Sequence, residues 1–253
     1  MKPLLRWILL VLVAAAALQA FMLARIALAA TVDPQSTTFQ RSEAWRIATH
    51  KGQLRWRQEW RDYAQISDHL KRAVIASEDG SFTNHDGVDW EAIEKAWERN
   101  TQAEERAARQ RPRSGAASLV APTRPPKIVG GSTITQQLAK NLLLSGERNL
   151  FRKGQEFILT FALERMLSKE RILEVYLNSV EWGEGVFGAE AAARHYFRKG
   201  ASQLTPYEAA RLAVMLPRPK YFEKVPNSGY LANRASTIVA RMRDAHLPQD
   251  GPE

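Results

Sequence analysis

An apolar run from Trp7 to Leu23, interrupted only by Gln19, dominates the start of the chain. A helix needs about 20 apolar residues to cross a bilayer. This run is long enough if the charged head of Arg25 extends to the membrane interface. The pattern therefore predicts a transmembrane anchor over residues 7–29.

The residues before the anchor set its orientation. Lys2 and Arg6 lie in the segment 1–6, and basic residues favour the cytoplasmic side of a membrane. We therefore expect residues 1–6 to form a cytoplasmic tail and the chain after residue 30 to be extracytoplasmic. A cleaved signal peptide is the alternative, because Ala27-Leu28-Ala29 offers a small-x-small site. The apolar regions of signal peptides usually have about 7–15 residues, however, and this run is longer.

Beyond the anchor, apolar residues recur at helical spacing and alternating strand patterns are scarce, which predicts an all-α fold. Residues 30–65 are polar and rich in tryptophan, and we expect a stem and first helix there. We expect the main domain over residues 66–222 and a C-terminal helical segment over 223–253. Within the main domain, the charged and then Ser/Ala/Pro-rich stretch 101–129 predicts a flexible loop.

Helix ends can be predicted from local signals in the main domain. One helix ends at Glu78-Asp79-Gly80, and another begins near Gly130-Gly131-Ser132. The capping box Thr205-Pro206-Tyr207-Glu208 opens a later helix. Further helices are expected over Glu156 to Leu167, around Ile172, Leu173 and Tyr176, and over Ala189 to Phe197, with a glycine-punctuated loop from Asn178 to Gly188.

The charge of the chain narrows the class of partner. Its 253 residues include 36 Lys and Arg and 27 Asp and Glu, a net charge of +9, which favours nucleic acid, an anionic membrane or a phosphorylated substrate. The extracytoplasmic placement argues against nucleic acid and leaves lipids and cell-envelope polymers. The chain has no cysteine, which excludes disulfides, thiolate nucleophiles and Cys-ligated zinc.

The first candidate cluster is Glu78-Asp79-Gly80-Ser81-Phe82-Thr83-Asn84-His85-Asp86-Gly87. One carboxylate can serve as a general base while Asp79 and His85 fix its orientation. A solvated acidic turn with glycines at positive φ is the alternative interpretation.

The second cluster is Gly130-Gly131-Ser132-Thr133-Ile134-Thr135-Gln136-Gln137-Leu138-Ala139-Lys140-Asn141. Ser132 or Thr133 can cap the helix. Thr133, Gln137 and Lys140 then share one stripe beside an apolar one. That stripe suits a sugar or a phosphate, and an ordinary amphipathic surface helix would show the same pattern.

Two further clusters are weaker on their own. One cluster has three cations within six residues at the start of a helix, Arg148, Arg152 and Lys153, and such a cluster suits a diphosphate. The alternative is that Arg152 forms an ion pair with Glu156 at i, i+4, which stabilises an exposed helix by about 0.3–0.5 kcal/mol. Asn178, at the end of Glu174-Val175-Tyr176-Leu177-Asn178, can reach a ligand across the glycine loop or can belong to the scaffold.

Together and in this order, the clusters resemble the motifs of the family 51 peptidoglycan glycosyltransferases, of the short, monofunctional, membrane-anchored kind. The matching motifs are Glu78-Asp79-x-x-Phe82-x-x-His85-x-Gly87, the whole second cluster, Arg152-Lys153-x-x-Glu156, Ile172-Leu173-Glu174-x-Tyr176-Leu177-Asn178 and Leu204-Thr205-x-x-Glu208-Ala209-Ala210-x-Leu212-Ala213. No Ser-x-x-Lys tetrad occurs and only 32 residues follow Tyr221, so we expect no transpeptidase domain.

The resemblance implies a lysozyme-like helical fold in two lobes, one of them partly embedded in the bilayer. The implied reaction polymerises lipid II, a disaccharide-pentapeptide on a polyprenyl diphosphate, into β-1,4-linked glycan strands and releases polyprenyl diphosphate. The implied location is the bacterial inner membrane, with a single-pass anchor and the catalytic domain on the periplasmic side. Proteins of cell-wall synthesis or division are candidate partners.

The resemblance also implies residue roles. Glu78 would be the general base of an inverting displacement. Glu156 would be a second essential acid that orients the cations or helps to hold a divalent cation, Mg or Mn, against the diphosphate, with no organic cofactor. The implied substrate-binding residues are Asp79, Phe82, His85, Ser132, Thr133, Gln137, Lys140, Arg148, Arg152, Lys153 and Asn178.

Two other functions remain open at this point. A peptidoglycan-cleaving enzyme of lysozyme-like architecture also needs an acidic glutamate, but it does not need four cations beside the cleft. A non-catalytic envelope scaffold needs neither.

Overall fold

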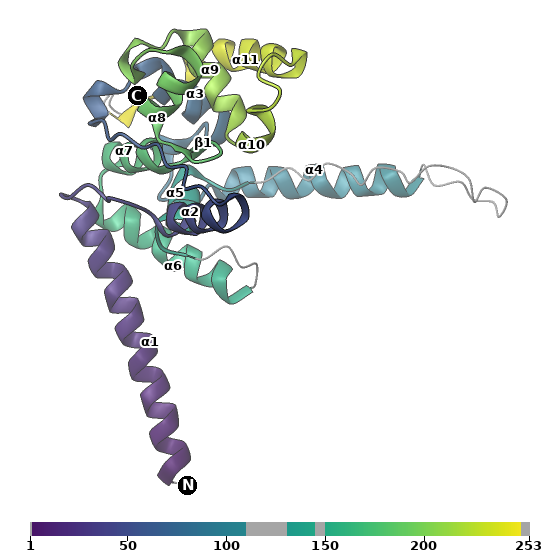
Figure 1. The fold of residues 1–253 in the computed structure, drawn as a ribbon. Helices are drawn as coiled ribbons and strands as arrows, with labels where there is room; N and C mark the ends of the chain where they lie inside the picture. Colours follow the sequence, from purple (N-terminus) through teal and green to yellow (C-terminus); the bar gives the residue numbers. More distant parts are fainter. Residues whose placement is uncertain (1, 110–130, 145–149, 249–253) are drawn as a thin grey trace, which may run out of the picture.

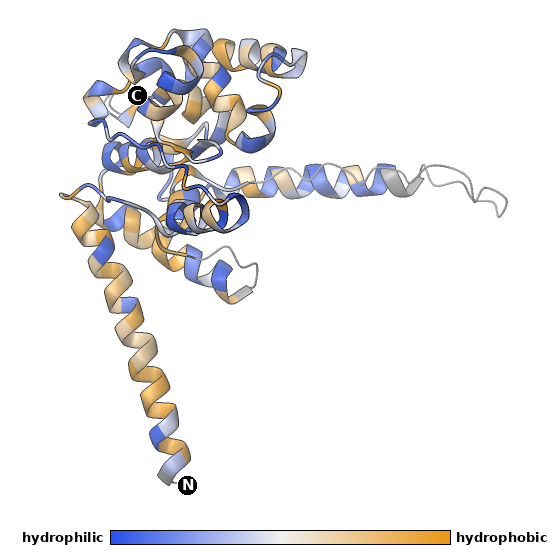
Figure 2. Ribbon diagram, viewed as in Figure 1, coloured by the Kyte–Doolittle hydropathy of each residue, from blue (hydrophilic) through white to orange (hydrophobic). Residues whose placement is uncertain are grey.

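The computed structural model describes residues 2–109, 131–144 and 150–248 of the chain. Helix α1 (Lys2–Ala29) extends away from the other helices (Figure 1). Its segment Pro3–Ala29 is long and apolar enough to cross a membrane, with a mean hydropathy of 2.4, and none of its most apolar 18-residue window is buried (Figure 2). This helix occupies the predicted anchor and accounts for association with a membrane.

The last turns of α1 nevertheless pack against the domain. Ile26 has no exposed surface and belongs to the main apolar core. Gln19, the polar interruption of the apolar run, accepts a hydrogen bond from Gln155 Nε2 on α6 (Leu150–Met166) at 2.6 Å. The anchor is therefore held to the domain by contacts as well as by the covalent chain.

The rest of the described chain is mainly helical, which confirms the predicted fold class. The further α-helices are α2 (Thr38–Lys51), α3 (Asp68–Glu78), α4 (Trp90–Arg109), α5 (Ile134–Leu143), α7 (Lys169–Ser179), α8 (Ala189–Phe197), α9 (Pro206–Met215), α10 (Pro219–Phe222) and α11 (Gly229–Arg241). Single 3₁₀ turns cover Tyr63–Gln65, Phe82–Asn84, Ala201–Gln203 and Met242–Asp244.

The helices form two groups with α7 between them (Figure 1). In one group α3, α9 and α11 pack against one another, and in the other α5 packs against both α2 and α6. Helix α7 contacts α5, α6 and α8. One apolar core runs through both groups. The end of α3 and the exposed side of α5 meet where the two groups adjoin.

Hydrogen bonds at the N-caps confirm the helix starts that the sequence predicted for α5 and α9. Thr133 is the N-cap of α5, and its hydroxyl accepts the backbone N–H of Gln136 while the Gln136 side chain accepts the N–H of Thr133. Thr205 and Glu208 make the same reciprocal pair at the start of α9. A capping box satisfies N–H groups that the first helical turn would otherwise leave without a partner.

The stem and the C-terminal segment are both docked onto the domain. In α2, the buried Gln40 donates from Nε2 to the carbonyl oxygen of Ser179 at 3.1 Å. Helix α11 lies in the predicted C-terminal helical segment, and its Ile238 has no exposed surface. Neither segment is an appendage of the domain, because each contributes to its packing.

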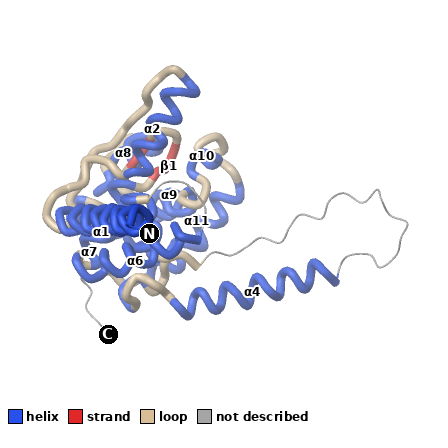
Figure 3. The backbone as a smooth tube through the Cα atoms, turned by 90° about the horizontal axis from the view of Figure 1, so that it is seen from below, coloured by secondary structure: helices blue, strands red, loops and turns tan. Residues whose placement is uncertain are grey.

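The predicted start of the flexible loop at residue 101 is wrong. Helix α4 continues to Arg109, and both views show it projecting from the body (Figures 1 and 3). The stretch is rich in Ala, Glu and Arg, whose high helix propensity extends the helix past the point where the apolar pattern fades. The remainder of the predicted loop, 110–129, lies outside the described residues.

The predicted loop from Asn178 to Gly188 is also wrong. Asn178 belongs to α7, and strand β1 (Glu181–Gly183) pairs antiparallel with β2 (Val186–Phe187). Two strands of two or three residues are too short to show an alternating pattern. Gly188 has a φ of 84°, and a Cβ there would lie 2.7 Å from the carbonyl oxygen of Asn178, so this close turn requires glycine.

Candidate active site

Glu78 lies at the last position of α3 and is half-buried. Its Oε2 accepts a hydrogen bond from Gln137 Nε2 on α5 at 2.9 Å. The buried Tyr176 on α7 donates its hydroxyl to Gln137 Oε1 at 3.0 Å, which fixes which end of the amide faces Glu78. Three helices from both groups thus determine the position of one carboxylate.

The surroundings of Glu78 make it a better proton acceptor than an exposed glutamate. Burial raises the pKa of Glu78, the hydrogen bond from Gln137 opposes this rise, and the negative charge of Asp79 adds to it. Lys140 acts in the opposite direction as a nearby cation. A carboxylate with a raised pKa suits general-base catalysis near neutral pH.

Asp79 and His85 hold the start of α5 in place. Asp79 is buried and accepts the backbone N–H of Ile134 through Oδ2 at 2.9 Å, and His85 Nε2 lies 2.8 Å from Asp79 Oδ1. His85 Nδ1 accepts the N–H of Gly87 at 3.1 Å, so Nε2 carries the hydrogen that Asp79 accepts. These two residues therefore orient α5, which carries Gln137.

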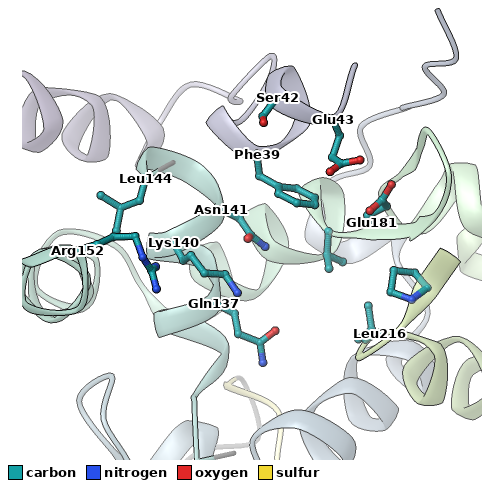
Figure 4. Close-up of a pocket in the computed structure, with 12 residues that line it drawn as sticks. Phe39, Ser42, Glu43, Gln137, Lys140, Asn141, Leu144, Arg152, Glu181 and Leu216 are labelled. Atoms are coloured by element: carbon teal, nitrogen blue, oxygen red, sulfur yellow. The ribbon is translucent and has the colours of Figure 1, made fainter. Parts of the chain in front are cut away.

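A cavity of about 450 Å³ opens beside Gln137 (Figure 4). Lys140 and Arg152 lie on one side of it and Glu43 and Glu181 on the other. Its lining comes from α2, α5, α6, β1 and the segment around α10: Phe39, Ser42, Glu43, Gln137, Lys140, Asn141, Leu144, Arg152, Val180, Glu181, Leu216 and Pro219. Glu78 and Ser132 line a neighbouring cavity of about 140 Å³, and Gln137 connects Glu78 to the larger one.

Glu156 is the counter-ion of two predicted cations. It is 4% exposed, and its carboxylate accepts from Arg152 Nη1 at 3.2 Å and from Lys153 Nζ at 2.5 Å. The Arg152–Glu156 pair at i, i+4 therefore forms as the sequence suggested, with Lys153 added. Glu156 holds the two cations in position beside the cavity.

Glu156 is also the residue that the sequence suggested could help to hold a divalent cation against the diphosphate. A hard divalent cation needs several oxygen ligands. In the described part of the chain, each oxygen of Glu156 accepts a hydrogen bond from a cation, Arg152 or Lys153, and the divalent cation stays a prediction.

A second acidic group, Asp79, His85 and Asp89, brings three potential ligand atoms within 4.8 Å of one another. Its members are already engaged: Asp89 accepts the N–H of Ala92 at 2.7 Å and a hydroxyl from Ser81, and both ring nitrogens of His85 have partners. The group ends one helix and begins two others.

Three residues predicted to bind substrate have other contacts. Phe82 and Asn178 have no exposed surface, and Asn178 bonds to both backbone groups of Arg61. The Thr133 hydroxyl donates to the carbonyl oxygen of Gly87 at 2.6 Å. Phe82 and Asn178 therefore belong to the packed interior, while Thr133 also lines the smaller cavity beside Glu78, and the substrate-binding roles stay predictions. Arg148 lies outside the described residues.

Other lining residues escaped the sequence reasoning. Phe39, Ser42 and Glu43 come from α2, which the sequence marked only as a stem, and nothing local links them to the site. Glu181 carried a usable signal: it is an acid between the apolar residues Val180 and Trp182, shortly after the motif that ends at Asn178. An acid in such a run is buried, and buried acids concentrate at functional sites.

The site thus combines a half-buried carboxylate, Glu78, with a neighbouring cavity bordered by Lys140 and Arg152 in a helical protein that carries an apolar N-terminal helix. The Transglycosylase family model matches residues 46–243, and the chain belongs to this family. Its fold is the all-α, lysozyme-like fold with an N-terminal membrane helix that the sequence predicted. The match extends beyond the predicted domain 66–222 at both ends, in line with the docking of α2 and α11.

Curated relatives are similar over most of the chain. A biosynthetic peptidoglycan transglycosylase of Paraburkholderia phytofirmans is 50% identical over 92% of this chain and 88% of its own length. One of Burkholderia thailandensis is 50% identical over 92% of this chain and 82% of its own length. One of Bordetella pertussis is 49% identical over 85% and 82% of the two chains.

Proposed function

We propose that this peptidoglycan glycosyltransferase polymerises lipid II by an inverting displacement in which Glu78 is the general base. The observation that carries this proposal is the Tyr176–Gln137–Glu78 chain of hydrogen bonds beside a cavity bordered by Lys140 and Arg152. This chain links Glu78 to the cavity that Lys140 and Arg152 border, which supports the assignment.

The reaction needs one proton acceptor and a stabilised leaving group. The 4-hydroxyl of the acceptor sugar attacks the anomeric carbon of the donor, a new C–O bond forms, and its proton passes to Glu78. The bond to the lipid diphosphate breaks at the same carbon. A single displacement converts an α-linked diphosphate into a β-linked product, so no covalent glycosyl-enzyme is required.

The leaving diphosphate gains negative charge as the bond breaks. Lys140, Arg152 and Lys153 are the described cations on this side of the site, and fixed cations stabilise charge that develops in a transition state. Glu156 keeps Arg152 and Lys153 in place without contacting the substrate itself. It therefore serves as a positioning residue.

The membrane side of the molecule suits a lipid substrate. Besides α1, the neighbouring α6 exposes Phe151, Ile158 and Phe161, which are 93%, 53% and 47% exposed. Such apolar surface beside an anchor favours contact with a bilayer. We propose a single-pass anchor in the inner membrane, with the catalytic domain on the periplasmic side and α6 at the membrane surface.

The test is a polymerisation assay with labelled lipid II and the full-length protein in detergent. We expect glycan polymer from the wild type and a rate about 10²–10⁴-fold lower for Glu78→Gln, the usual contribution of a general base. Glu91→Gln, the same change at an exposed residue of α4, should leave the rate unchanged.

The same preparations incubated with finished sacculi separate synthesis from cleavage. Soluble fragments from sacculi without polymer from lipid II would reassign the protein to peptidoglycan cleavage. An unchanged polymerisation rate for Glu78→Gln would remove the base assignment.

A further inference from the structure

The end of α1 that meets the domain borders another cavity, of about 330 Å³. Arg25 and Leu28 line it from the last turns of α1, Val32 from the segment after α1, and Arg41 from α2. This end of α1 lies beside the domain, and the rest of the helix extends away from it (Figure 1). The cavity therefore lies where the predicted membrane span ends.

The two arginines of this cavity have no acidic partner among the residues that the structure describes. Arg41 donates from Nη1 to the carbonyl oxygen and the hydroxyl of Ser36, both at 3.0 Å, and from Nη2 to Thr38 Oγ1 at 3.2 Å. The Arg25 guanidinium lies 6.0 Å from the centre of the Phe21 ring and makes no hydrogen bond or ion pair with another described residue. Arg25 and Arg41 are close enough for their like charges to repel. An anion in the cavity would offset this repulsion.

The one acid that lines the cavity is engaged elsewhere. Asp33 Oδ1 pairs with Arg171 Nη2 on α7 at 2.8 Å. Arg171 Nε also donates to the carbonyl oxygen of Ala29 at 2.8 Å, which holds the segment after α1 in place. Because Arg171 balances the charge of Asp33, the cavity keeps the positive charge of Arg25 and Arg41, which favours an anionic ligand.

The same cavity has an apolar side. Leu28 and Val32 are 59% and 49% exposed, and the N–H of Val32 donates to the carbonyl oxygen of Leu28 at 2.9 Å. Both residues lie at the end of the membrane span, where the hydrocarbon core of a bilayer gives way to its headgroups. Guanidinium groups bind phosphate well, because their N–H groups match its oxygens in pairs. A ligand with a phosphate and an apolar body at this level is a membrane lipid.

We propose that this cavity binds an anionic phospholipid of the bilayer, with its phosphate between Arg25 and Arg41 and its acyl chains against Leu28 and Val32. The bound phosphate replaces the repulsion between the two arginines by an attraction to both, and it joins α1 to α2 at the level of the headgroups. This inference goes beyond the proposed function and needs only the membrane association of α1.

The phospholipid site is separate from the proposed substrate cavity. Leu142 is the residue of α5 that lines it, whereas Gln137 and Lys140 line the larger cavity. In a helix, positions 137 and 140 share a face and position 142 lies on the opposite side. The phospholipid is therefore a different molecule from the lipid II that reacts.

Native mass spectrometry of the full-length protein in detergent measures this binding. The probes are phosphatidylglycerol, which is anionic, and phosphatidylcholine with the same acyl chains, which also carries a cation. We expect one phosphatidylglycerol to bind about tenfold more tightly than phosphatidylcholine, because the choline cation is repelled by the two arginines. Arg25→Gln and Arg41→Gln should each weaken phosphatidylglycerol binding about tenfold, the equivalent of one hydrogen bond to a charged group. Equal binding of the two lipids by the wild type would refute the site.

The matched control is Arg165→Gln on α6, the helix next to α1. Arg165 is exposed and does not line the cavity, so this variant should keep the wild-type Kd for phosphatidylglycerol. An equal loss in Arg165→Gln and in the two cavity variants would mean that net charge alone holds the lipid, which contradicts the proposal.

Two competitors identify the source of the phosphate. Inorganic phosphate lacks acyl chains and should not displace phosphatidylglycerol at equal concentration; displacement would make this a plain anion site and overturn the proposal. Lipid II should also leave the bound phosphatidylglycerol in place. One-for-one displacement by lipid II would make the cavity a substrate site instead. If the wild type binds phosphatidylglycerol as expected but makes no polymer from lipid II, only the proposed function fails.

A further variant covers the case in which an arginine variant does not fold. Val32→Glu places a negative charge at an exposed position of the cavity, where it repels the phosphate. It should weaken phosphatidylglycerol binding about tenfold. A Kd equal to that of the wild type would refute the phospholipid site.

Discussion

Replacing Tyr176 by phenylalanine tests whether the amide of Gln137 controls the basicity of Glu78. Tyr176 is 1% exposed, and its hydroxyl donates to Gln137 Oε1 at 3.0 Å. Burial raises the pKa of Tyr176 well above its usual value, so the hydroxyl remains a donor at every pH of interest. Tyr176→Phe removes this one donor and leaves the ring in place.

The structure sets the sign and size of two effects. Removing the hydroxyl deprives the half-buried Gln137 amide of this donor, which costs about 1 kcal/mol of folding stability. Gln137 can then rotate and withdraw its N–H from Glu78, and that hydrogen bond is what opposes the burial-induced rise of the Glu78 pKa. The pKa of Glu78 should therefore rise further.

The assay is the pH dependence of kcat/KM for lipid II polymerisation. Because the base must be deprotonated, the acidic limb of the profile should move to higher pH in Tyr176→Phe. For a rise of about one pKa unit, equivalent to ~1.4 kcal/mol, we expect kcat/KM to fall about tenfold on the acidic limb well below the wild-type midpoint. Above the limb the two enzymes should converge.

The matched control is Tyr230→Phe on α11, where the ring is 56% exposed and distant in the chain from the site. It should reproduce the wild-type profile. A Tyr176→Phe profile that is lower by the same factor at every pH would mean that the hydroxyl supports the site only structurally. An unchanged profile would refute the control of Glu78 by Gln137.

Two further substitutions test the cations and the hairpin. Lys140 is exposed on α5, so Lys140→Ala should lower the polymerisation rate about 10–100-fold, which corresponds to the loss of one charge-assisted hydrogen bond. The circular dichroism spectrum of the variant should stay unchanged. Loss of the helical spectrum would instead make Lys140 part of the scaffold. Gly188 has φ 84°, and a Cβ would lie 2.7 Å from the carbonyl oxygen of Asn178, so Gly188→Ala should cost about 1–3 kcal/mol or more in a denaturant titration. An unchanged midpoint would show that the hairpin can relax.

Features set by neighbouring residues could be predicted from the sequence. The bounds of α8, Ala189–Phe197, were predicted correctly, and so was the capping box of α9, because it involves residues only three positions apart. For α5 the sequence left Ser132 or Thr133 as the cap, and the structure has Thr133. The end of α3 at Glu78 was likewise predicted by Gly80 two positions later.

Features set by tertiary contacts could not be predicted in this way. Phe82 and Asn178 belong to motifs shared with enzymes, and a motif does not state which of its members face the ligand and which support it. Their complete burial depends on packing from other elements, such as Arg61 against Asn178. Glu43 reaches the cavity only because α2 docks against α5, a contact between segments about 100 residues apart.

Glutamates 78, 156 and 181 show why the chemistry required coordinates. Glu78 and Glu181 line the two cavities and Glu156 contacts Arg152, which lines the larger one, yet the neighbours of the three carboxylates differ. Glu78 receives a hydrogen bond from a neutral amide, so it remains available to take a proton. Glu156 contacts two cations and is committed to holding them.

Glu181 is buried near Lys220, and burial is the main cause that raises its pKa to about 7. A protein that used a lysine where Gln137 stands would stabilise the Glu78 carboxylate and weaken the base, since an opposite charge favours the ionised form. A neutral donor orients the carboxylate at a smaller loss of basicity. The identity of residue 137 therefore matters as much to the proposed mechanism as that of the base it holds.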